Sequence, residues 1–324
     1  MTTRVARTSV AVLSHTFEVG ETLTDATGTP TVAVTDATGA AVSSGNATHT
    51  TPGTYTYSLA GQSSLGWLTA AWSATIAGAS VVQSDQVEIV GGFFFTLAQG
   101  RGSDDSLADT SIYQTADLEL ARLQVEQEAE AICDRAFVPR YLRMVLNGTG
   151  NSDLVLAHPD PDRTVAAVRT IRSVRMAPRA DQTFVSFTAA ELAALTVADD
   201  GTLRRQDNRV FTEGFQNIII ELEYGLDAPP PDLVQAALTR FRSRLNFNRS
   251  QIPDRASSYT AADGGTYRLS MPGPWQTGIP EVDATYARYS RRSTGTGPTG
   301  RRVPASRTWN LDPQRASLFH GGRR

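Results

Sequence analysis

The chain has 324 residues, enough for two domains and a tail with a sizeable hydrophobic core. Hydrophobic residues make up 40% of it, but no run approaches the ~18 apolar residues of a membrane helix, which excludes a transmembrane protein. A single cysteine excludes a disulfide framework and a cysteine-ligated metal cluster. The first residues lack the apolar core of a secretory signal, so we expect a protein made and kept in a cytoplasm.

Charge is distributed unevenly along the chain. The net charge is −3, and every one of the 30 basic residues is arginine. Residues 1–92 carry a net charge of −4, residues 93–287 carry −7, and residues 288–324 carry +8. A basic tail on an acidic body predicts an acidic partner, which is either nucleic acid or another protein.

Residues 1–92 are rich in Thr, Ala and Gly and contain short stretches of alternating polarity, with turn residues every ten or so positions. In one such stretch Tyr55 and Tyr57 share a face, and in another Trp67 and Trp72 lie on opposite faces. This pattern predicts an all-β, immunoglobulin-like sandwich. Residues 93–110 are Gly-rich and acidic around a Phe triplet and are predicted as a linker.

Two stretches have the apolar period of an amphipathic helix. The first runs from Leu118 to Ala136, and the second follows a triple proline and runs from Val234 to Leu245. A mainly α-helical domain with a small β insert at 138–224 is therefore expected over 111–250. The second helix also carries Arg240, Arg242 and Arg244, which are candidates for an interface with nucleic-acid phosphates, against a solvated helix face as the simpler interpretation.

Residues 251–324 are predicted as an extended C-terminal arm with a short helix at 280–292 and a basic tail. The last thirty residues contain too few apolar side chains to offset the entropy of ordering, so we expect them to be disordered when free. Aromatic anchors spread through the whole weakly structured arm predict folding on a partner's groove. These anchors are Trp275, Tyr286, Tyr289 and Trp309.

The most enzyme-like cluster is His158, Asp160 and Asp162, where an imidazole and two carboxylates could bind a metal or transfer protons. Two prolines and the lack of further ligands at suitable spacing favour a turn with solvated carboxylates. Cys133 is expected to pack against a helix rather than act as a nucleophile, because it lies near a helix C-terminus beside an acidic residue. No hydrolase, nucleotide or dehydrogenase signature occurs, so we expect no enzymatic activity, no metal and no cofactor.

The order of these elements resembles the head-to-tail adaptor (connector) proteins of long-tailed bacteriophages. The similarity covers about Thr110 to Arg292 and is carried by EAEAICDRAFVPRY, IIIELEYGLDAPPPDLVQAALTRFRSRLNF and GIPEVDATYARYSRR. It implies a non-enzymatic neck protein of the virion, assembled in the host cytoplasm as a ring of twelve copies. Such a ring docks on the portal protein, completes the head after packaging, extends the channel for packaged DNA and receives a stopper or other neck or tail protein, with no membrane involved.

The same resemblance assigns roles to individual residues. It implies that the ring wall contains Leu118, Val125, Ile132, Val234, Leu238, Phe241 and Leu245. It implies that the portal-docking arm contains Trp275, Ile279, Val282, Tyr286, Tyr289, Arg291 and Arg292. The predicted fold class is thus a multidomain α+β protein: an immunoglobulin-like sandwich over 1–92, a mainly α-helical connector domain and an extended basic tail.

Two other functions stay open from the sequence. In the first, the protein is a surface or glycan-binding module of a virion that acts through the exposed aromatics of its N-terminal sandwich. In the second, it is a metal-dependent hydrolase that uses His158 and its two neighbouring aspartates.

Overall fold

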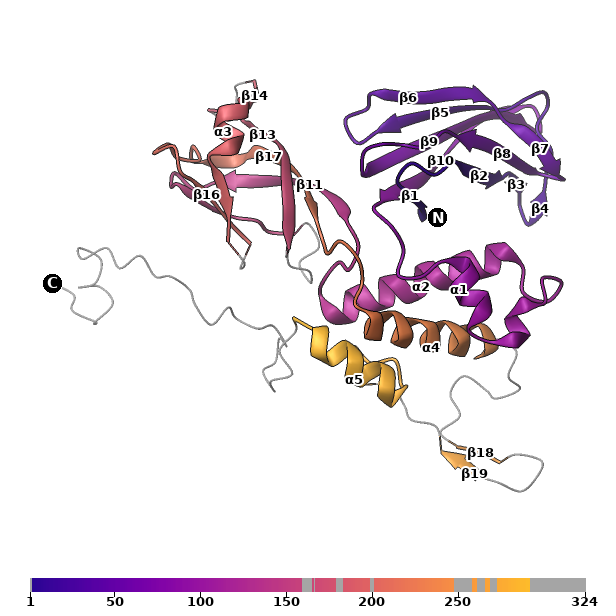
Figure 1. Cartoon of the computed structure of the whole chain (residues 1–324). Coiled ribbons are helices and arrows are strands. Elements are labelled where there is room, and N and C mark those ends of the chain that lie inside the picture. The colour runs from indigo at the N-terminus through magenta and orange to yellow at the C-terminus, as the bar shows by residue number, and fades with distance from the viewer. Residues whose placement is uncertain are drawn as a thin grey trace. The chain divides into compact units, whose positions relative to one another are not determined.

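A computed structural model describes residues 2–158, 165, 167–178, 183–198, 201–247, 258–260, 266–268 and 273–291 (Figure 1). The contacts of the chain divide it after Ser290. The described residues up to Ser290 form three hydrophobic cores: one between the N-terminal sheets, one among helices and one in a second β-rich region.

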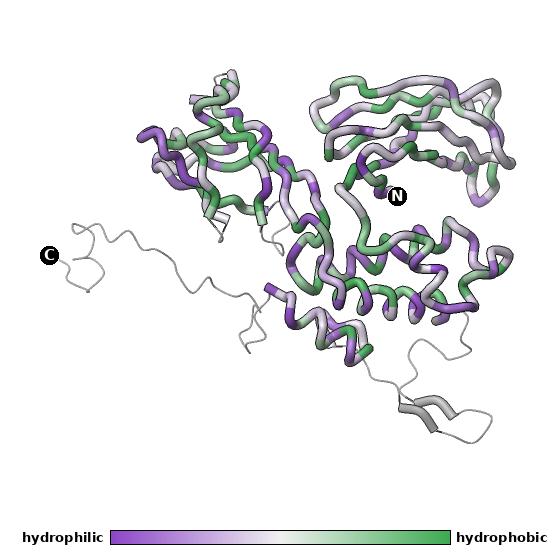
Figure 2. The backbone as a smooth tube through the Cα atoms, in the orientation of Figure 1, coloured by the Kyte–Doolittle hydropathy of each residue, from purple (hydrophilic) through white to green (hydrophobic). Residues whose placement is uncertain are grey.

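The N-terminal region consists of two sheets that enclose one core. The first has the strand order β1-β10-β9-β5-β6 and the second the order β2-β8-β7, with a separate ribbon β3-β4. Hydrophobic and hydrophilic residues alternate along these strands (Figure 2), and in β9 the buried Leu68, Ala70 and Trp72 share the inner face. The strands are β1 (Thr2–Ala6), β2 (Ala11–Thr16), β3 (Glu18–Val19), β4 (Thr22–Leu23), β5 (Thr31–Asp36), β6 (Ala41–Asn46), β7 (Thr48–Thr51), β8 (Thr54–Leu59), β9 (Gly66–Ile76) and β10 (Ala79–Val90).

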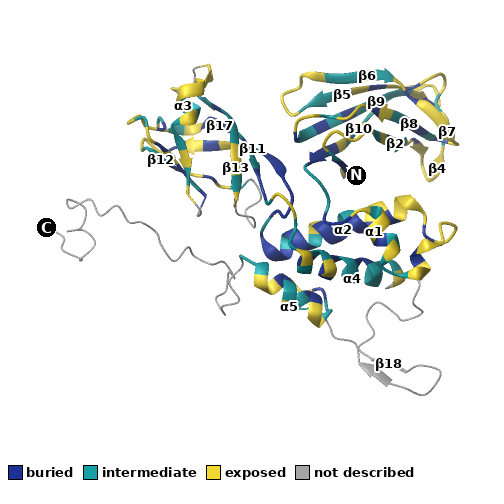
Figure 3. Ribbon diagram, viewed as in Figure 1, coloured by how far each residue is buried: buried dark blue, intermediate teal, exposed yellow. Residues whose placement is uncertain are grey.

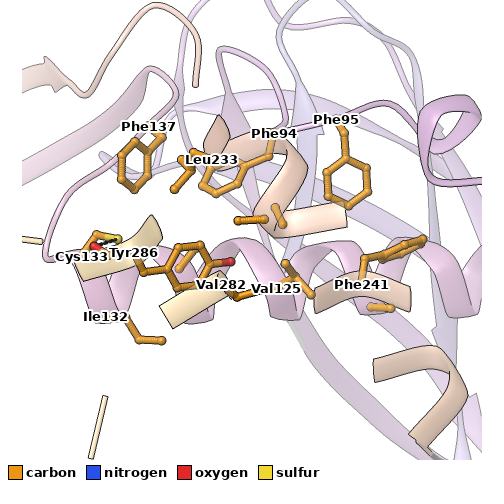
Figure 4. Packing of buried hydrophobic residues seen from close by; sticks show 14 of the residues in the cluster. Phe94, Phe95, Val125, Ile132, Cys133, Phe137, Leu233, Phe241, Val282 and Tyr286 are labelled. Carbon is orange, nitrogen blue, oxygen red and sulfur yellow. Dashed lines mark hydrogen bonds between the residues drawn. The ribbon is translucent and has the colours of Figure 1, made fainter. Parts of the chain in front are cut away.

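The helical region begins directly after β10, and two helices from later in the chain complete it. Its helices are α1 (Leu97–Gly102), the 3-10 helix η1 (Asp105–Ala108), α2 (Thr115–Cys133), α4 (Pro231–Phe247) and α5 (Pro280–Tyr289). Helices α2, α4 and α5 pack against one another, and each presents buried residues to a common core, as Figure 3 shows. The segment predicted as a linker, 93–110, instead forms α1 and η1 and contributes the buried Leu107 to that core. It also contributes Phe94 and Phe95, which Figure 4 shows.

The second β-rich region lies between α2 and α4 in the sequence. One sheet has the order β11-β17-β13-β14 and the other the order β12-β16-β15, with all pairs antiparallel. Their shared core includes Met144, Ile218, Ile220 and Leu222. The elements are β11 (Arg140–Gly148), β12 (Asp153–Val155), β13 (Val168–Met176), β14 (Val185–Ser186), α3 (Ala189–Ala193), β15 (Leu195–Val197), β16 (Thr202–Arg205) and β17 (Gly214–Tyr224).

The predicted fold class is wrong in its central claim, since the region after the N-terminal sheets is not a mainly α-helical connector domain. Strands hold more residues of the structure than helices do, and the predicted small insert is a two-sheet unit with its own hydrophobic core. The physical reason is long-range pairing: β17 joins both β11 and β13, more than forty residues away in the sequence. Periodicity within a short window cannot detect such pairing.

A last hairpin lies between α4 and α5. Its strands are β18 (Ser258–Thr260) and β19 (Thr266–Arg268). Within the described part of the chain these two strands pair only with each other.

Candidate functional site

The most unusual backbone of the second β-rich region lies where β17 begins, beside a bulge in β11. A Cβ at Gly148 would lie 1.7 Å from the carbonyl oxygen of Thr212, so only glycine fits there. Gln216 has a φ of 49°, in the left-handed region that non-glycine residues rarely adopt. Its N–H donates to the side-chain oxygen of Asn147 at 2.7 Å. Bulges re-aim side chains and gather near functional sites, so this turn is a candidate.

The buried Asn217 holds the turn in place. Its side-chain oxygen accepts a hydrogen bond from the Gly148 N–H at 2.8 Å. Its amide nitrogen donates to the carbonyl oxygens of Thr212 at 2.9 Å and Ala177 at 3.2 Å. One amide group thereby satisfies three backbone groups of three different segments, which makes the turn rigid.

The rigid turn keeps an aromatic ring in solvent. Phe215 is 74% exposed, and Val145 of β11 and Val155 of β12 are 46% and 65% exposed. Clustered exposed apolar side chains with a polar rim mark interaction sites. We call the depression that they share, of about 460 Å³, the Phe215 patch; it is lined by Val145, Leu146, Asn147, Thr149, Asp153, Leu154, Val155, Ala157, Phe215 and Gln216.

The Phe215 patch is electrically neutral. Its one acidic lining residue, Asp153, accepts hydrogen bonds from Nε and Nη2 of Arg204, each at 2.6 Å. These bonds hold the pKa of Asp153 below its usual value. Among the described residues that line the patch none is arginine. Nucleic acids select basic surfaces, whereas a neutral patch with an exposed aromatic ring suits a protein partner.

A second cluster, buried rather than exposed, connects the three regions of the fold. It contains Arg4 of β1, Glu88 of β10, Glu126 and Glu130 of α2, and Arg140 of β11, and we call it the ion cluster. Arg4 donates to all three carboxylates, at 3.2 Å, 3.1 Å and 2.8 Å in chain order. Arg140 donates to Glu88 through Nε and, at 2.7 Å, through Nη2, and to Glu130 at 2.6 Å.

The ion cluster is close to neutral when one carboxylate holds a proton, since two arginines face three glutamates. Burial raises the pKa of Glu126 to about 7, although Arg4 and the Phe94 N–H oppose this rise. Burial also disfavours the Glu130 carboxylate, but the guanidiniums of Arg140 and Arg4 outweigh it and hold the pKa of Glu130 below its usual value. Buried pairs of this kind fix geometry. Sequence reasoning missed all five residues, because they come from positions 4 to 140 and show no local pattern.

The predicted ring-wall residues form the interior of the helical region. Leu118, Val125, Ile132 and Phe241 are buried in its core. Val234, Leu238 and Leu245 are partly buried against the same core. All seven therefore pack within the chain and leave the polar sides of α2 and α4 for any neighbour.

The predicted docking arm packs on its own chain. Val282 and Tyr286 of α5 are fully buried between α2 and α4, and the Cys133 thiol donates to the Tyr286 carbonyl oxygen (Figure 4). Tyr289 and Arg288 donate to Asp232 of α4 at 2.7 Å and 2.9 Å. This part of the arm is structural, because its apolar stripe is already covered.

The remaining arm residues differ among themselves. Ile279 is partly buried against the helical core, Trp275 is half exposed with a φ of 62°, and Arg291 is of intermediate exposure. Arg292, Trp309 and the rest of the predicted basic tail lie outside the described residues.

The three arginines of α4 bind groups of their own chain. Arg240 forms two bonds of 2.8 Å with the Glu128 carboxylate of α2. Arg244 donates to the Gln124 side chain at 2.8 Å, and Arg242 donates to the Ser103 carbonyl oxygen at 3.2 Å. These contacts fix α4 against α2 and α1, so the arginines have structural roles whichever way their free N–H groups face.

The enzyme-like residues do not form a described site. Asp160 and Asp162 lie outside the described residues. The His158 ring packs edge-to-face with the Tyr224 ring, with 6.4 Å between the ring centroids. No group of three or more His, Cys, Asp or Glu side chains suited to a metal ion occurs in the part of the chain that the structure describes. Burial raises the pKa of the Cys133 thiol to about 12, which keeps it protonated.

The aromatic residues of the N-terminal sandwich are mostly inside it. Trp72 and Tyr55 are buried, and the Tyr55 hydroxyl accepts a hydrogen bond from the Ala26 N–H at 2.8 Å. Tyr57 and Trp67 are of intermediate exposure. These four residues therefore act in sheet packing and do not form an open aromatic platform.

Comparisons with known proteins identify no relative from which a function of this chain can be inferred. No protein-family model and no curated protein matches the chain. One solved structure, "Crystal structure of tetra-tandem repeat in extending region of large adhesion protein", is similar at 15% identity with a TM-score of 0.20. The match covers 68% of this chain and about half, 49%, of that one. Among the described residues no helix is long and apolar enough to cross a membrane.

Proposed function

We propose that the protein is a structural assembly protein of a tailed-phage virion, a head-to-tail adaptor without enzymatic activity. In this function it forms a homo-oligomeric ring between the portal and the next neck or tail protein, and packaged DNA passes through the ring. The support from the sequence is the resemblance over Thr110 to Arg292. The observation that carries the proposal is the Phe215 patch, which is rigid, neutral and exposed.

A ring subunit needs a contact surface that is already formed in the free protein, because ordering side chains on association weakens binding. The Asn217 amide supplies this order in the turn that carries Phe215. A patch that accepts a different surface of the next copy gives a head-to-tail contact, which closes into a ring when the rotation between copies allows it. We therefore assign the Phe215 patch to the contact between copies.

The ion cluster supports an assembly function in a different way. It ties the N-terminal sandwich, through Arg4 and Glu88, to α2 and β11. A domain held by buried ion pairs keeps one geometry. This suits a subunit whose several surfaces must meet several neighbours at the same time.

The alternative, a glycan-binding module, receives less support. Sugar-binding sandwiches present open aromatic rings, and here Tyr55 and Trp72 are buried. Binding of residues 1–92 to a glycan array would revive this alternative.

The adaptor function is tested by the mass of the protein, alone and with the portal, measured by mass photometry. A truncation after Arg291 tests the predicted basic tail separately from the helical core, because it keeps α5 and its core residues Val282 and Tyr286. We expect rings or portal complexes for the full chain and their loss in Phe215→Asp. The control Val12→Asp should keep them, because it changes a valine of β2 that is 68% exposed, close to the 74% of Phe215, but lies outside the patch. A full chain that stays monomeric and ignores the portal would reject the adaptor function.

A further inference from the structure

The β3–β4 ribbon of the sandwich presents apolar and acidic side chains together to solvent. Val19 and Leu23 are 49% and 47% exposed, and Glu18 and Glu21 are exposed as well. Glu18 pairs directly with Leu23, and directly opposed residues of an antiparallel pair lie on the same face. One face of the ribbon therefore combines a carboxylate with an apolar side chain.

The two carboxylates of the ribbon have no cation to pair with in the sandwich. No arginine or lysine occurs between Arg7 and Arg101, and six acidic residues lie in that stretch. Four of the six have partners within the chain: Asp25 with His49 and the Gly53 N–H, Asp36 within its own turn, Asp85 with His15, and Glu88 in the ion cluster. The carboxylates of Glu18 and Glu21 have no hydrogen-bond or ion-pair partner among the described residues, so they are available to another molecule.

The base of the ribbon is fixed to the sandwich. Phe17, which precedes β3, is buried. Its N–H donates to the Gly53 carbonyl oxygen at 2.8 Å, and its carbonyl oxygen accepts a hydrogen bond from the Thr24 N–H at 3.0 Å. The Gly53 N–H donates to the Asp25 side chain at 2.6 Å. The ribbon is therefore ordered before a partner binds, which lowers the entropic cost of a contact.

The ribbon lies at one end of the sandwich (Figure 1), and the contacts to the rest of the chain lie at the other. Just before β9 begins, the Leu65 carbonyl oxygen accepts a hydrogen bond from Arg172 of β13 at 2.6 Å. Near the end of β9, the Thr75 carbonyl oxygen accepts one from the N–H of Thr27, shortly after the ribbon, at 2.7 Å. The eleven residues of β9 span about 33 Å between these points. The sandwich is thus held at one end and presents the ribbon at the other.

Positive charge borders the Phe215 patch on the outer face of β11. Arg143 and Val145 lie two residues apart on that face, and Val145 lines the patch. Arg143 and Arg175 of β13 face one carboxylate, that of Glu221, at 3.7 Å and 3.3 Å, so positive charge is in excess. Nε of Arg143 is buried and has no hydrogen-bond partner among the described residues. A carboxylate from a partner would complete this group with charge-assisted hydrogen bonds.

We propose that the β3–β4 ribbon of one copy docks on the Phe215 patch of a second copy, with Leu23 against Phe215 and Glu18 beside Arg143. Apolar side chains then meet apolar side chains, and unpaired carboxylates meet excess arginine. The inference rests on the proposed function in one respect, the contact between copies, and it gives the N-terminal sandwich a function in that contact. Each copy has one ribbon and one patch, so the contact is head-to-tail and can repeat around a closed ring.

The test uses full-length charge-reversal variants, analysed alone and with the portal by sedimentation velocity and mass photometry over a range of concentrations. The ribbon variant carries Glu18→Arg and Glu21→Arg. The edge variant carries Arg143→Glu. Circular dichroism shows that each variant is folded.

Two matched controls reverse charges elsewhere. Arg209→Glu changes an arginine that is 67% exposed and pairs with Glu191 at 2.6 Å, as Arg143 pairs with Glu221 beside the patch. Glu281→Arg changes an exposed glutamate in the first turn of α5. Both controls should assemble as the unmodified chain does.

The ribbon variant and the edge variant should each assemble at least about tenfold more weakly than the unmodified chain, because like charges then face each other. An equimolar mixture of the two should restore assembly, since every contact between alternating copies again joins opposite charges. Salt at about 1 M should reduce the difference between each variant and the unmodified chain, because it screens exposed charges and leaves apolar contacts in place.

Two outcomes would overturn the docking of the ribbon: variants that assemble as the unmodified chain does, or a mixture that stays unassembled. Rings that are lost in Phe215→Asp and ignore the charge reversals would keep the patch as the contact and reject the ribbon as its occupant. Portal complexes that are lost in the edge variant but not in the ribbon variant would assign the patch to the portal and also reject the ribbon. A chain that stays monomeric alone and with the portal would reject the adaptor function as well.

Discussion

The two ends of β11 have opposite surroundings. At one end Arg140 lies in the buried ion cluster with two carboxylates around it, and at the other Val145 lies in solvent beside Phe215. Charge is inside and apolar area is outside, the reverse of the usual distribution. Each half of this inversion has a cost, because desolvating ions and hydrating apolar surface are both unfavourable.

The contrast teaches what each end contributes. Each charged residue of the ion cluster has ion-pair partners within the chain, so the cluster serves the internal geometry of the subunit. One buried atom of the cluster, Oε1 of Glu130, accepts no hydrogen bond from the described residues. The Phe215 patch is incomplete, since its apolar side chains have solvent where a neighbour would pack. One strand therefore joins the rigid centre of the subunit to the surface proposed for the next copy.

The largest expected effect comes from removing one partner of the ion cluster. Arg140→Met leaves Glu88 and Glu130 buried beside a single guanidinium, which should lower the free energy of unfolding by about 3–5 kcal/mol. Arg204→Met breaks the exposed pair with Asp153 and should cost less than about 1 kcal/mol. Urea denaturation followed by circular dichroism compares the two; equal losses would mean that burial does not strengthen the cluster.

A pH series should separate Glu126 from Glu130, the two glutamates of α2 that belong to the ion cluster. Because burial raises the pKa of Glu126 to about 7 from an ordinary 4.5, the folded chain keeps a proton that the unfolded chain releases between these values. The free energy of unfolding should therefore fall by about 3 kcal/mol as the pH rises from 4.5 to 7 and then level off. Glu130 has the opposite shift, so its contribution is present above its unfolded pKa and is lost at lower pH.

Glu126→Gln should remove the loss between pH 4.5 and 7, because the amide does not titrate. Arg4, Arg122 and the Phe94 N–H, which all act on Glu126, stay in place. Glu119→Gln, at an exposed position of the same helix, is the matched control. Urea denaturation at several pH values gives the slope, and an unchanged slope in Glu126→Gln would assign the titration to another group.

A smaller effect is expected at the turn that carries Phe215. Asn217→Ala leaves the Gly148 N–H and two carbonyl oxygens without their side-chain partner, so we expect a loss of about 2 kcal/mol in stability. The turn should also lose its fixed geometry, so assembly should weaken more than stability alone explains. Concentration-dependent mass photometry of the folded variant measures this; full assembly would show that the Asn217 amide does not order the patch.

Local patterns in the sequence predicted the two long helices α2 and α4 well, but they missed α1 and η1 and predicted long-range features poorly. The stripe from Leu118 and the triple proline before Val234 mark α2 and α4 to within a few residues, because helical period and proline are local signals. The β-rich region between them was underestimated, since its short strands gain their stability from pairing across more than forty residues. Sheet pairing of this range has no signature in a single window.

The candidate site was harder still to predict. The stripe of Val282 and Tyr286 shows that α5 needs a groove, but the sequence cannot say whose, and the structure supplies one between α2 and α4 of the same chain. The sequence did not predict Phe215 as a site residue, because the exposure of a single aromatic side chain depends on residues that are distant in the sequence. The signal that could have found it is the sequence Gly-Phe-Gln-Asn at 214–217, where a glycine and an asparagine flank an aromatic at the start of a strand.

The smallest expected effect separates strain from function at that turn. Gln216→Gly removes the cost of a left-handed backbone at a non-glycine residue but adds freedom to the unfolded chain, so the net gain in stability should be below about 1 kcal/mol. Gln216→Val, a β-branched residue at the same φ, should be destabilising. Thermal unfolding ranks the three chains. Because Gln216 lines the Phe215 patch, Gln216→Gly should also assemble more weakly than the unmodified chain, and unchanged assembly in mass photometry would show that the Gln216 side chain does not belong to the contact.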